Sequence, residues 1–185
     1  MLSALLDANV LYPAPIRDLL LSLAEDDLFK PFWSKAIHQE WRRNLLENRP
    51  DLDPQRIDRT IDLMNQAFPD AEIEGYENRI AALSLKDPDD RHVLAAAVEA
   101  NADYLVTANL KDFQTPSLQP KGIQIIHPDA FVCQLSSQHR DAVFKSFVKL
   151  VSRLENPPQS KATVLSTLEK CGLTETVRVL RECKE

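Results

Sequence analysis

The feature that most constrains the fold is a pair of short segments that are apolar along most of their length, at residues 3–7 (Ser-Ala-Leu-Leu-Asp) and 104–107 (Tyr-Leu-Val-Thr). Strands without alternating apolar and polar side chains are typical of the centre of a parallel sheet, where helices cover both faces. Apolar residues at helical spacing occupy residues 16–23, and an alanine-rich helical stretch leads directly into the second segment. The pattern predicts an α/β protein with a central parallel sheet and helices on both faces.

The rest of the chain divides into a mixed part and a helical part. Further strands are predicted at residues 28–33 and 123–126, with an extended stretch near Glu72. Helices are predicted at 34–48 with Ser34 as N-cap, from Asp53 to about 68, at about 90–101 and from His127 onward. Beyond about residue 138 the pattern is helical only, at 138–155 and 160–183, with a break at Gly172 and Thr174 as the next N-cap.

Charge and length suggest how the chain is organised. Residues 1–132 carry 13 basic and 22 acidic side chains, a net charge of −9, whereas residues 133–185 carry 9 and 6, a net charge of +3. A chain of this length has room for one substantial core with a small appendage. We therefore expect a domain at residues 1–137 and a helical extension at 138–185. Apolar residues recur at helical intervals in the extension and need a partner surface, which is left open between the first domain, a second copy and another protein: Leu165, Leu168, Leu173, Val177 and Leu180.

Several classes of protein and site are excluded by what the sequence lacks. It has only three glycines, far apart, so a glycine-rich phosphate loop is absent, as are the HExxH and GxSxG motifs. Its four histidines have no metal-ligand spacing, and its three cysteines argue against a disulfide framework. No apolar run approaches the roughly 20 residues that span a bilayer, and an acid comes too early for a signal peptide. We expect a cytoplasmic protein whose chemistry rests on carboxylates.

Acidic and amide side chains follow the predicted strands at their carboxyl ends, where open parallel sheets bind their ligands. Asp7 closes the first strand, and Asn109 and Asp112 follow the strand at 104–107. On the helix before that strand, residues 93, 94, 97 and 98 form the buried stripe, and Asp90 lies near its centre, so we expect this carboxylate to face inward. By the same phase argument Asp89 and His92 are expected to face solvent.

Three further candidate acids, Asp87, Asp89 and Glu40, also have a plain structural explanation. Asp87 and Asp89 suit the N-terminus of a helix after an Asp-Pro turn, whose dipole favours negative charge. Glu40 lies on the flank of its helix, where it either reaches the sheet edge or stays exposed beside Arg43. If the carboxylates do meet, their mutual repulsion calls for a hard divalent cation such as Mg²⁺ or Mn²⁺, which is suited to phosphoryl chemistry.

An ordered set of motifs resembles a known family. The segments are LLDANVLYP, IHQEWRRNL, DPDDRHVLAAAVEANADYLVTANLKDF and GIQIIHPDAF, which together span roughly residues 2–135. They resemble the PIN-domain family, and within it the VapC-like toxins of bacterial toxin–antitoxin pairs, in the subgroup with a C-terminal helical extension. The resemblance implies a three-layer α/β/α sandwich, a Mg²⁺- or Mn²⁺-dependent endoribonuclease activity on RNA and a cognate antitoxin.

The resemblance also implies roles for individual residues. The family's four acidic positions correspond to Asp7, Glu40, Asp90 and Asp112. Many relatives carry Asp where this chain has Asn109, so the fourth ligand is open between Asn109 and Asp112, and the number of metal ions is open with it. Asn9 and Thr107 match polar positions that orient the acids.

Other interpretations remain beside this one. Haloacid-dehalogenase-like phosphatases need a second acid two residues after the first, and this chain has Asn9 there. A PIN-like module that binds RNA or protein without cutting it is a second alternative, and a homodimer is left open. The basic residues Lys35, Arg42, Arg43, Arg49 and Lys111, with the basic extension, either follow RNA phosphates or form solvated surfaces.

Overall fold

The computed structural model describes residues 1–83, 85, 87–113 and 122–183. Its centre is a four-stranded parallel sheet with the strand order β2-β1-β3-β4. The strands are β1 (Ser3–Leu6), β2 (Lys30–Phe32), β3 (Tyr104–Val106) and β4 (Gln124–Ile126). The predicted strands are therefore all present, although each is shorter than expected, most of all the one predicted at 28–33.

The two apolar segments lie side by side in the middle of the sheet. Leu5 pairs with Leu105 and Leu6 with Val106, and all four side chains are fully buried. The chain leaves β1 toward β2 on one side and later returns to β3 on the other side, so the topology reverses between β1 and β3. Ligand crevices of open α/β sheets lie at such a switch point, beyond the carboxyl ends of the strands.

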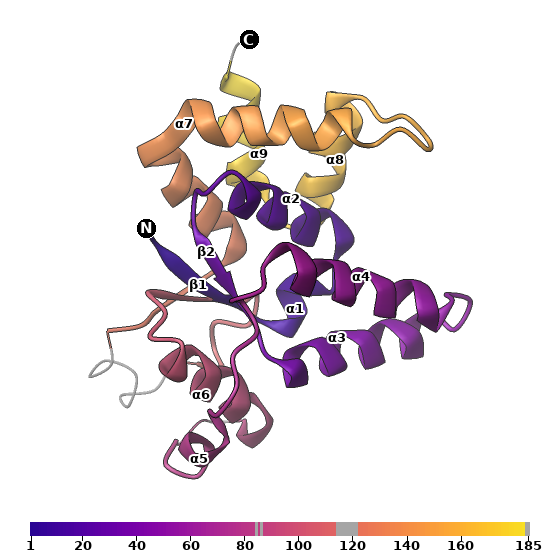
Figure 1. Cartoon of the computed structure of the whole chain (residues 1–185). Helices are drawn as coiled ribbons and strands as arrows, with labels where there is room; N and C mark the ends of the chain where they lie inside the picture. Colours follow the sequence, from indigo (N-terminus) through magenta and orange to yellow (C-terminus); the bar gives the residue numbers. More distant parts are fainter. Residues whose placement is uncertain (84, 86, 114–121, 184–185) are drawn as a thin grey trace.

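Helices cover both faces of the sheet, as the sequence predicts. Figure 1 shows α5 and α6 on one side of the strands and α2 with α7 on the other. In the same view α3 and α4 extend side by side to the right of the strands. These layers confirm the predicted α/β sandwich with added C-terminal helices. The helices of the first part are α1 (Ala8–Leu11), α2 (Ala14–Glu25), α3 (Lys35–Asn48), α4 (Pro54–Ala67), α5 (Glu77–Ile80), the 3-10 helix η1 (Pro88–Asp90) and α6 (Arg91–Glu99).

The helical part packs on the first part of the chain. It consists of α7 (Pro128–Ser152), with a non-helical backbone at His139, then α8 (Lys161–Lys170) and α9 (Thr174–Glu182). Both α7 and α8 contact α2. The expected boundary after residue 137 falls inside α7, two residues before the kink, and stays a prediction. The five apolar residues whose partner the sequence leaves open are all buried in the core that also contains the sheet.

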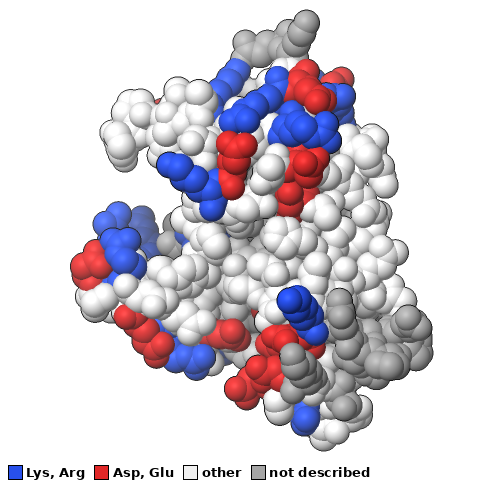
Figure 2. All heavy atoms as spheres, turned by 180° about the vertical axis from the view of Figure 1, so that it is seen from behind, with Lys and Arg blue, Asp and Glu red and all other residues white. Residues whose placement is uncertain are grey.

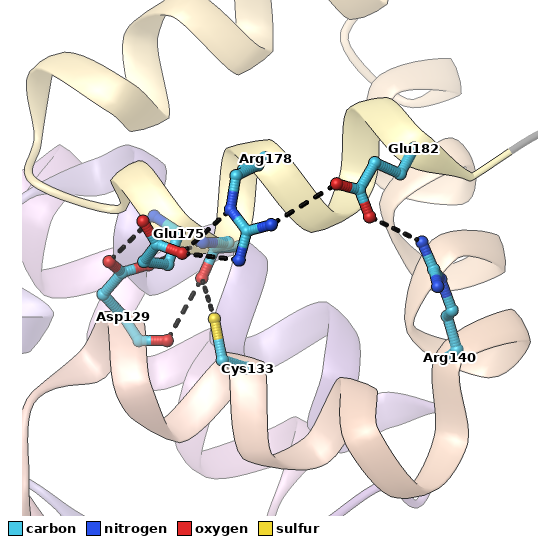
Figure 3. Close-up of polar contacts among 7 residues, drawn as sticks. Asp129, Cys133, Arg140, Glu175, Arg178 and Glu182 are labelled. Carbon is cyan, nitrogen blue, oxygen red and sulfur yellow. Dashed lines mark hydrogen bonds and ion pairs between the residues drawn. The ribbon is translucent and has the colours of Figure 1, made fainter.

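Local capping is predicted well, with one correction. The Ser34 hydroxyl accepts from the Ile37 N–H at 3.2 Å, as expected of an N-cap. Thr174 is not an N-cap: α9 begins at Thr174, and the carboxylate of Asp129, on α7, accepts from the N–H groups of Glu175 at 3.0 Å and Thr176 at 2.8 Å (Figure 3). This cap comes from 46 residues away and therefore leaves no local sequence signal.

In the part of the chain that the structure describes, no helix combines the length and the apolar character needed to cross a membrane.

Candidate active site

Asp7 stands at the switch point of the sheet. It follows β1, its N–H donates to the Val106 carbonyl of β3 at 3.1 Å, and it is the N-cap of α1 through a bond from the Ala8 N–H at 2.7 Å. Its side chain is buried among the ends of the two central strands. Burial raises the pKa of Asp7, because the charged form loses water, although the bonds from Thr107 and Ala8 and the nearby His92 oppose that rise.

A small polar network holds the Asp7 carboxylate in place. Its Oδ2 accepts from the Thr107 hydroxyl at 2.7 Å and from the Asn9 amide at 2.7 Å. The Asn9 Oδ1 in turn accepts from the Ala108 N–H at 2.9 Å, so the loop after β3 is tied to the loop after β1. Asn9 and Thr107 therefore lie where residues that orient Asp7 would lie, and that role stays a prediction.

Asp90 is half-buried and electrostatically coupled to the other acids. It is the N-cap residue of α6, yet its side chain makes no capping bond to that helix. Burial, and after it repulsion from the carboxylates of Asp7, Asp87, Asp112 and Glu40, together raise the pKa of Asp90 to about 6. The other three acids of the sequence prediction thus lie close enough to Asp90 to oppose its ionisation, and such a perturbed carboxyl group is typical of functional sites.

Glu40 reaches this region from α3. Its Oε2 lies 3.2 Å from Nε2 of His92, which is in the first turn of α6. The expectation that His92 faces solvent is wrong: its side chain is 21% exposed and points to α3. A helical wheel assigns the face opposite the core to solvent, but at this end of α6 that face meets a second helix.

Asp112 and Asn109 are paired in the loop after β3. The Asn109 amide donates to the Asp112 carboxylate, and the Asn109 N–H donates to the Thr107 hydroxyl at 3.1 Å. The choice of fourth ligand stays open between them. Asp87 and Asp89 are exposed, and Asp87 accepts from the Asp89 N–H at 2.9 Å, in keeping with the capping explanation for Asp87.

The donor chemistry of the site fits a hard divalent cation. Its side chains offer carboxylate and amide oxygens, the ligands that Mg²⁺ and Mn²⁺ prefer, and the pKa of Asp90 is raised by burial and then by the negative charge of the other acids. Within the described residues, however, no three acidic, histidine or cysteine side chains already surround one point. In this arrangement Glu40 is bonded to His92 and Asp112 to Asn109.

Comparison with known proteins identifies the family. The profile of the PIN domain matches residues 3–111, more than half of the chain. This chain belongs to the PIN-domain family. The profile of the VapC50 C-terminal domain matches residues 128–182, which confirms the resemblance to PIN proteins with a helical extension.

A relative has been described in Mycobacterium tuberculosis (strain ATCC 25618 / H37Rv). It is named "Putative ribonuclease VapC50" and is 36% identical over 94 residues, 51% of this chain and 55% of that protein. The match thus spans about half the length of the relative.

The basic side chains of this PIN protein differ in whether they are paired with acids, and this difference bears on which of them could contact a polyanion. Arg42 pairs with Asp58 and Arg49 with Asp51, both through two hydrogen bonds. On the extension, basic and acidic side chains are mixed, as the top of Figure 2 shows, because its arginines pair with glutamates: Arg140, Arg178 and Arg181 with Glu182, Glu175 and Glu169. Lys35, Arg43 and Lys111 are exposed.

Proposed function

We propose that this PIN protein is a metal-dependent endoribonuclease and acts in the cytoplasm as the toxin of a toxin–antitoxin pair. The observation that supports the proposal is the concentration of negative charge at the switch point, where Asp7 is buried and where burial and repulsion from Asp7, Asp87, Asp112 and Glu40 raise the pKa of Asp90 to about 6. Such a cluster is costly unless a cation neutralises it. The name of the M. tuberculosis relative supports RNA as the substrate.

The residues have distinct tasks in this proposal. Asp7, Glu40, Asp90 and Asp112 would hold Mg²⁺ or Mn²⁺, with Asn109 as an alternative to Asp112. The ion, when bound, polarises the scissile phosphate and lowers the pKa of a water molecule. Thr107 and Asn9 keep the Asp7 carboxylate in one orientation through their two bonds to Oδ2.

The protein's own charges also support roles in RNA binding. Lys35 and Arg43 are exposed on α3, the helix of Glu40, and Lys111 is exposed beside Asp112. They are the basic residues that we propose to contact phosphates, whereas Arg42 and Arg49 are engaged by Asp58 and Asp51.

An antitoxin and a homodimer are proposed as partners on the strength of the family alone. The apolar stripe of the extension is buried within this chain. Either partner would therefore bind another surface.

The experiment that tests the activity is incubation of the purified protein with total cellular RNA in Mg²⁺, Mn²⁺ or EDTA, followed by mapping of the cleaved ends. We expect defined cleavage sites with metal and none with EDTA. Asp7→Asn, purified identically, controls for contaminating ribonuclease. RNA binding without cleavage in any metal would favour the non-catalytic alternative.

A further inference from the structure

The four acids of the site differ in how firmly their side chains are held. Asp7 is fixed by three hydrogen bonds, from Ala8, Asn9 and Thr107. Glu40 has a longer side chain with more rotatable bonds, and its ordering therefore costs more conformational entropy. The side-chain hydrogen bond that the structure gives it is the one to His92.

The environment of His92 fixes how this bond is made. A glutamate carboxylate only accepts, so the 3.2 Å contact requires the proton to be on Nε2 of His92, the tautomer being assigned from the partner. The other ring nitrogen, Nδ1, is buried and has no hydrogen-bond partner among the described residues. Among the described residues, Glu40 is therefore the hydrogen-bond partner of this ring.

His92 also links α3, which carries Glu40, to α6, which begins directly after Asp90. It belongs to α6, two residues after Asp90, while Glu40 belongs to α3. The charges of Glu40 and His92 also act, with opposite signs, on the pKa of the buried Asp7. The hydrogen bond to Oε2 restricts the direction of the Glu40 side chain. The second carboxylate oxygen, Oε1, is then available to bind a metal ion.

We propose that His92 is a positioning residue: it donates from Nε2 to Glu40 and orients that carboxylate as a metal ligand, as Thr107 and Asn9 do for Asp7. The inference deepens the proposed function and rests on it. A donor behind a metal-binding carboxylate is a general feature of metal sites, and its loss typically costs about 10–100-fold in metal affinity.

The test is Mn²⁺ binding to the full chain, measured by titration calorimetry. His92→Phe keeps a planar ring without a donor, and we expect its Mn²⁺ affinity to fall by about 10-fold or more. His92→Gln places an amide N–H near the position of Nε2, and its affinity should stay close to that of the unsubstituted chain. His139→Gln, an exposed histidine at the kink of α7, is the matched control.

A double substitution separates positioning from a general effect on folding. Once Glu40→Ala has removed the ligand, adding His92→Phe should cause no further loss of affinity. If His92→Phe does not fold, His92→Asn replaces it, because the shorter amide does not reach Glu40.

Three outcomes would overturn the inference. In the first, the donor-free variant binds Mn²⁺ as tightly as the unsubstituted chain, or more tightly, while Glu40→Ala weakens binding. In the second, the Gln variant loses as much affinity as the Phe or Asn variant. The third is distinguishable from both: if the unsubstituted chain does not bind Mn²⁺, or Asp7→Asn binds it unchanged, the proposed function fails and the inference fails with it.

Discussion

At the scale of single residues, Asp7 is the acid whose loss should separate activity from folding. Asp7→Asn removes the charge with little change in volume, and we expect RNA cleavage to fall by about 100-fold or more, as when other groups that stabilise charge are removed. The unfolding midpoint in EDTA should hold or rise, because burial already raises the pKa of Asp7 and so penalises its ionised form. Cleavage rates and thermal unfolding measure the two effects, and cleavage at the unsubstituted rate would contradict the mechanism.

Asp90 makes a prediction about pH. Its pKa is raised to about 6 in the folded protein, so protonated Asp90 favours folding, and that contribution is lost as the pH rises through about 6. In EDTA at pH 7.5, Asp90→Asn should therefore raise the unfolding midpoint by about 2–4 °C, allowing for solvent screening at a half-exposed group. The gain should shrink as the pH is lowered from 6 toward 4.

Two controls make the Asp90 result specific. Asp89→Asn removes a charge from the exposed neighbour and should leave the midpoint nearly unchanged. Adding Mg²⁺ should raise the midpoint of the unsubstituted chain and not that of Asp90→Asn. A gain that grows at lower pH would mean that the sign of the Asp90 contribution is wrong.

From helical phase alone, the inward direction of Asp90 stays a prediction and the outward direction of His92 is wrong, and the reason for the second outcome is physical. The apolar stripe of α6 fixes which face of that helix meets the sheet, and Asp90 lies in phase with it. The surroundings of the opposite face depend on where α3 lies, and the contact between His92 and Glu40 joins residues 52 positions apart in the sequence. A helical wheel contains no such information, so the pairing of His92 with Glu40 becomes visible only in the fold.

At the scale of elements, the cap of α9 shows how the start of α7 holds the last helix of the chain. The Asp129 carboxylate accepts from the N–H groups of Glu175 and Thr176, and the Thr176 hydroxyl donates back to the Asp129 carbonyl at 3.2 Å (Figure 3). Asp129→Ala should destabilise the protein by about 1–2 kcal/mol, the usual cost of losing a helix cap. Chemical denaturation measures this cost.

A matched substitution on the same helix supports the interpretation. Asp141→Ala removes an exposed acid from α7 and should change the unfolding free energy by less than about 0.5 kcal/mol. Equal effects of the two substitutions would show that the cap contributes nothing of its own.

The elements themselves are largely predictable from the sequence, because strands, helix starts and the Pro and Gly breaks are local signals. Ser34 caps α3 as predicted, and Asp53, where the sequence predicts the start of a helix, is the N-cap of α4. The sequence does not predict the features that depend on distant segments. These are the short helix α5, which buries no residue of its own, and the capping of α9 by Asp129.

At the scale of the whole molecule, helix α2 belongs to two packing surfaces at once. It lies against β2 and also against α7 and α8. The buried residues of the extension join those of the sheet in one core. Lys149 of α7 also donates to Asp26, at the end of α2, at 2.6 Å. These contacts favour unfolding of the PIN part and the extension together.

The position of the two tryptophans allows this to be tested by comparing two probes. Trp33 and Trp41 are both buried in the PIN part, so their fluorescence reports its unfolding, whereas far-ultraviolet circular dichroism reports all helices. We expect the two denaturant transitions to coincide. Leu168→Ala, at a fully buried position of α8, should lower both midpoints together, with a loss of about 2–5 kcal/mol. Lys170→Ala, exposed on the same helix, should move neither. A fluorescence transition that stays in place while the dichroism transition shifts would show that the extension unfolds independently of the PIN part.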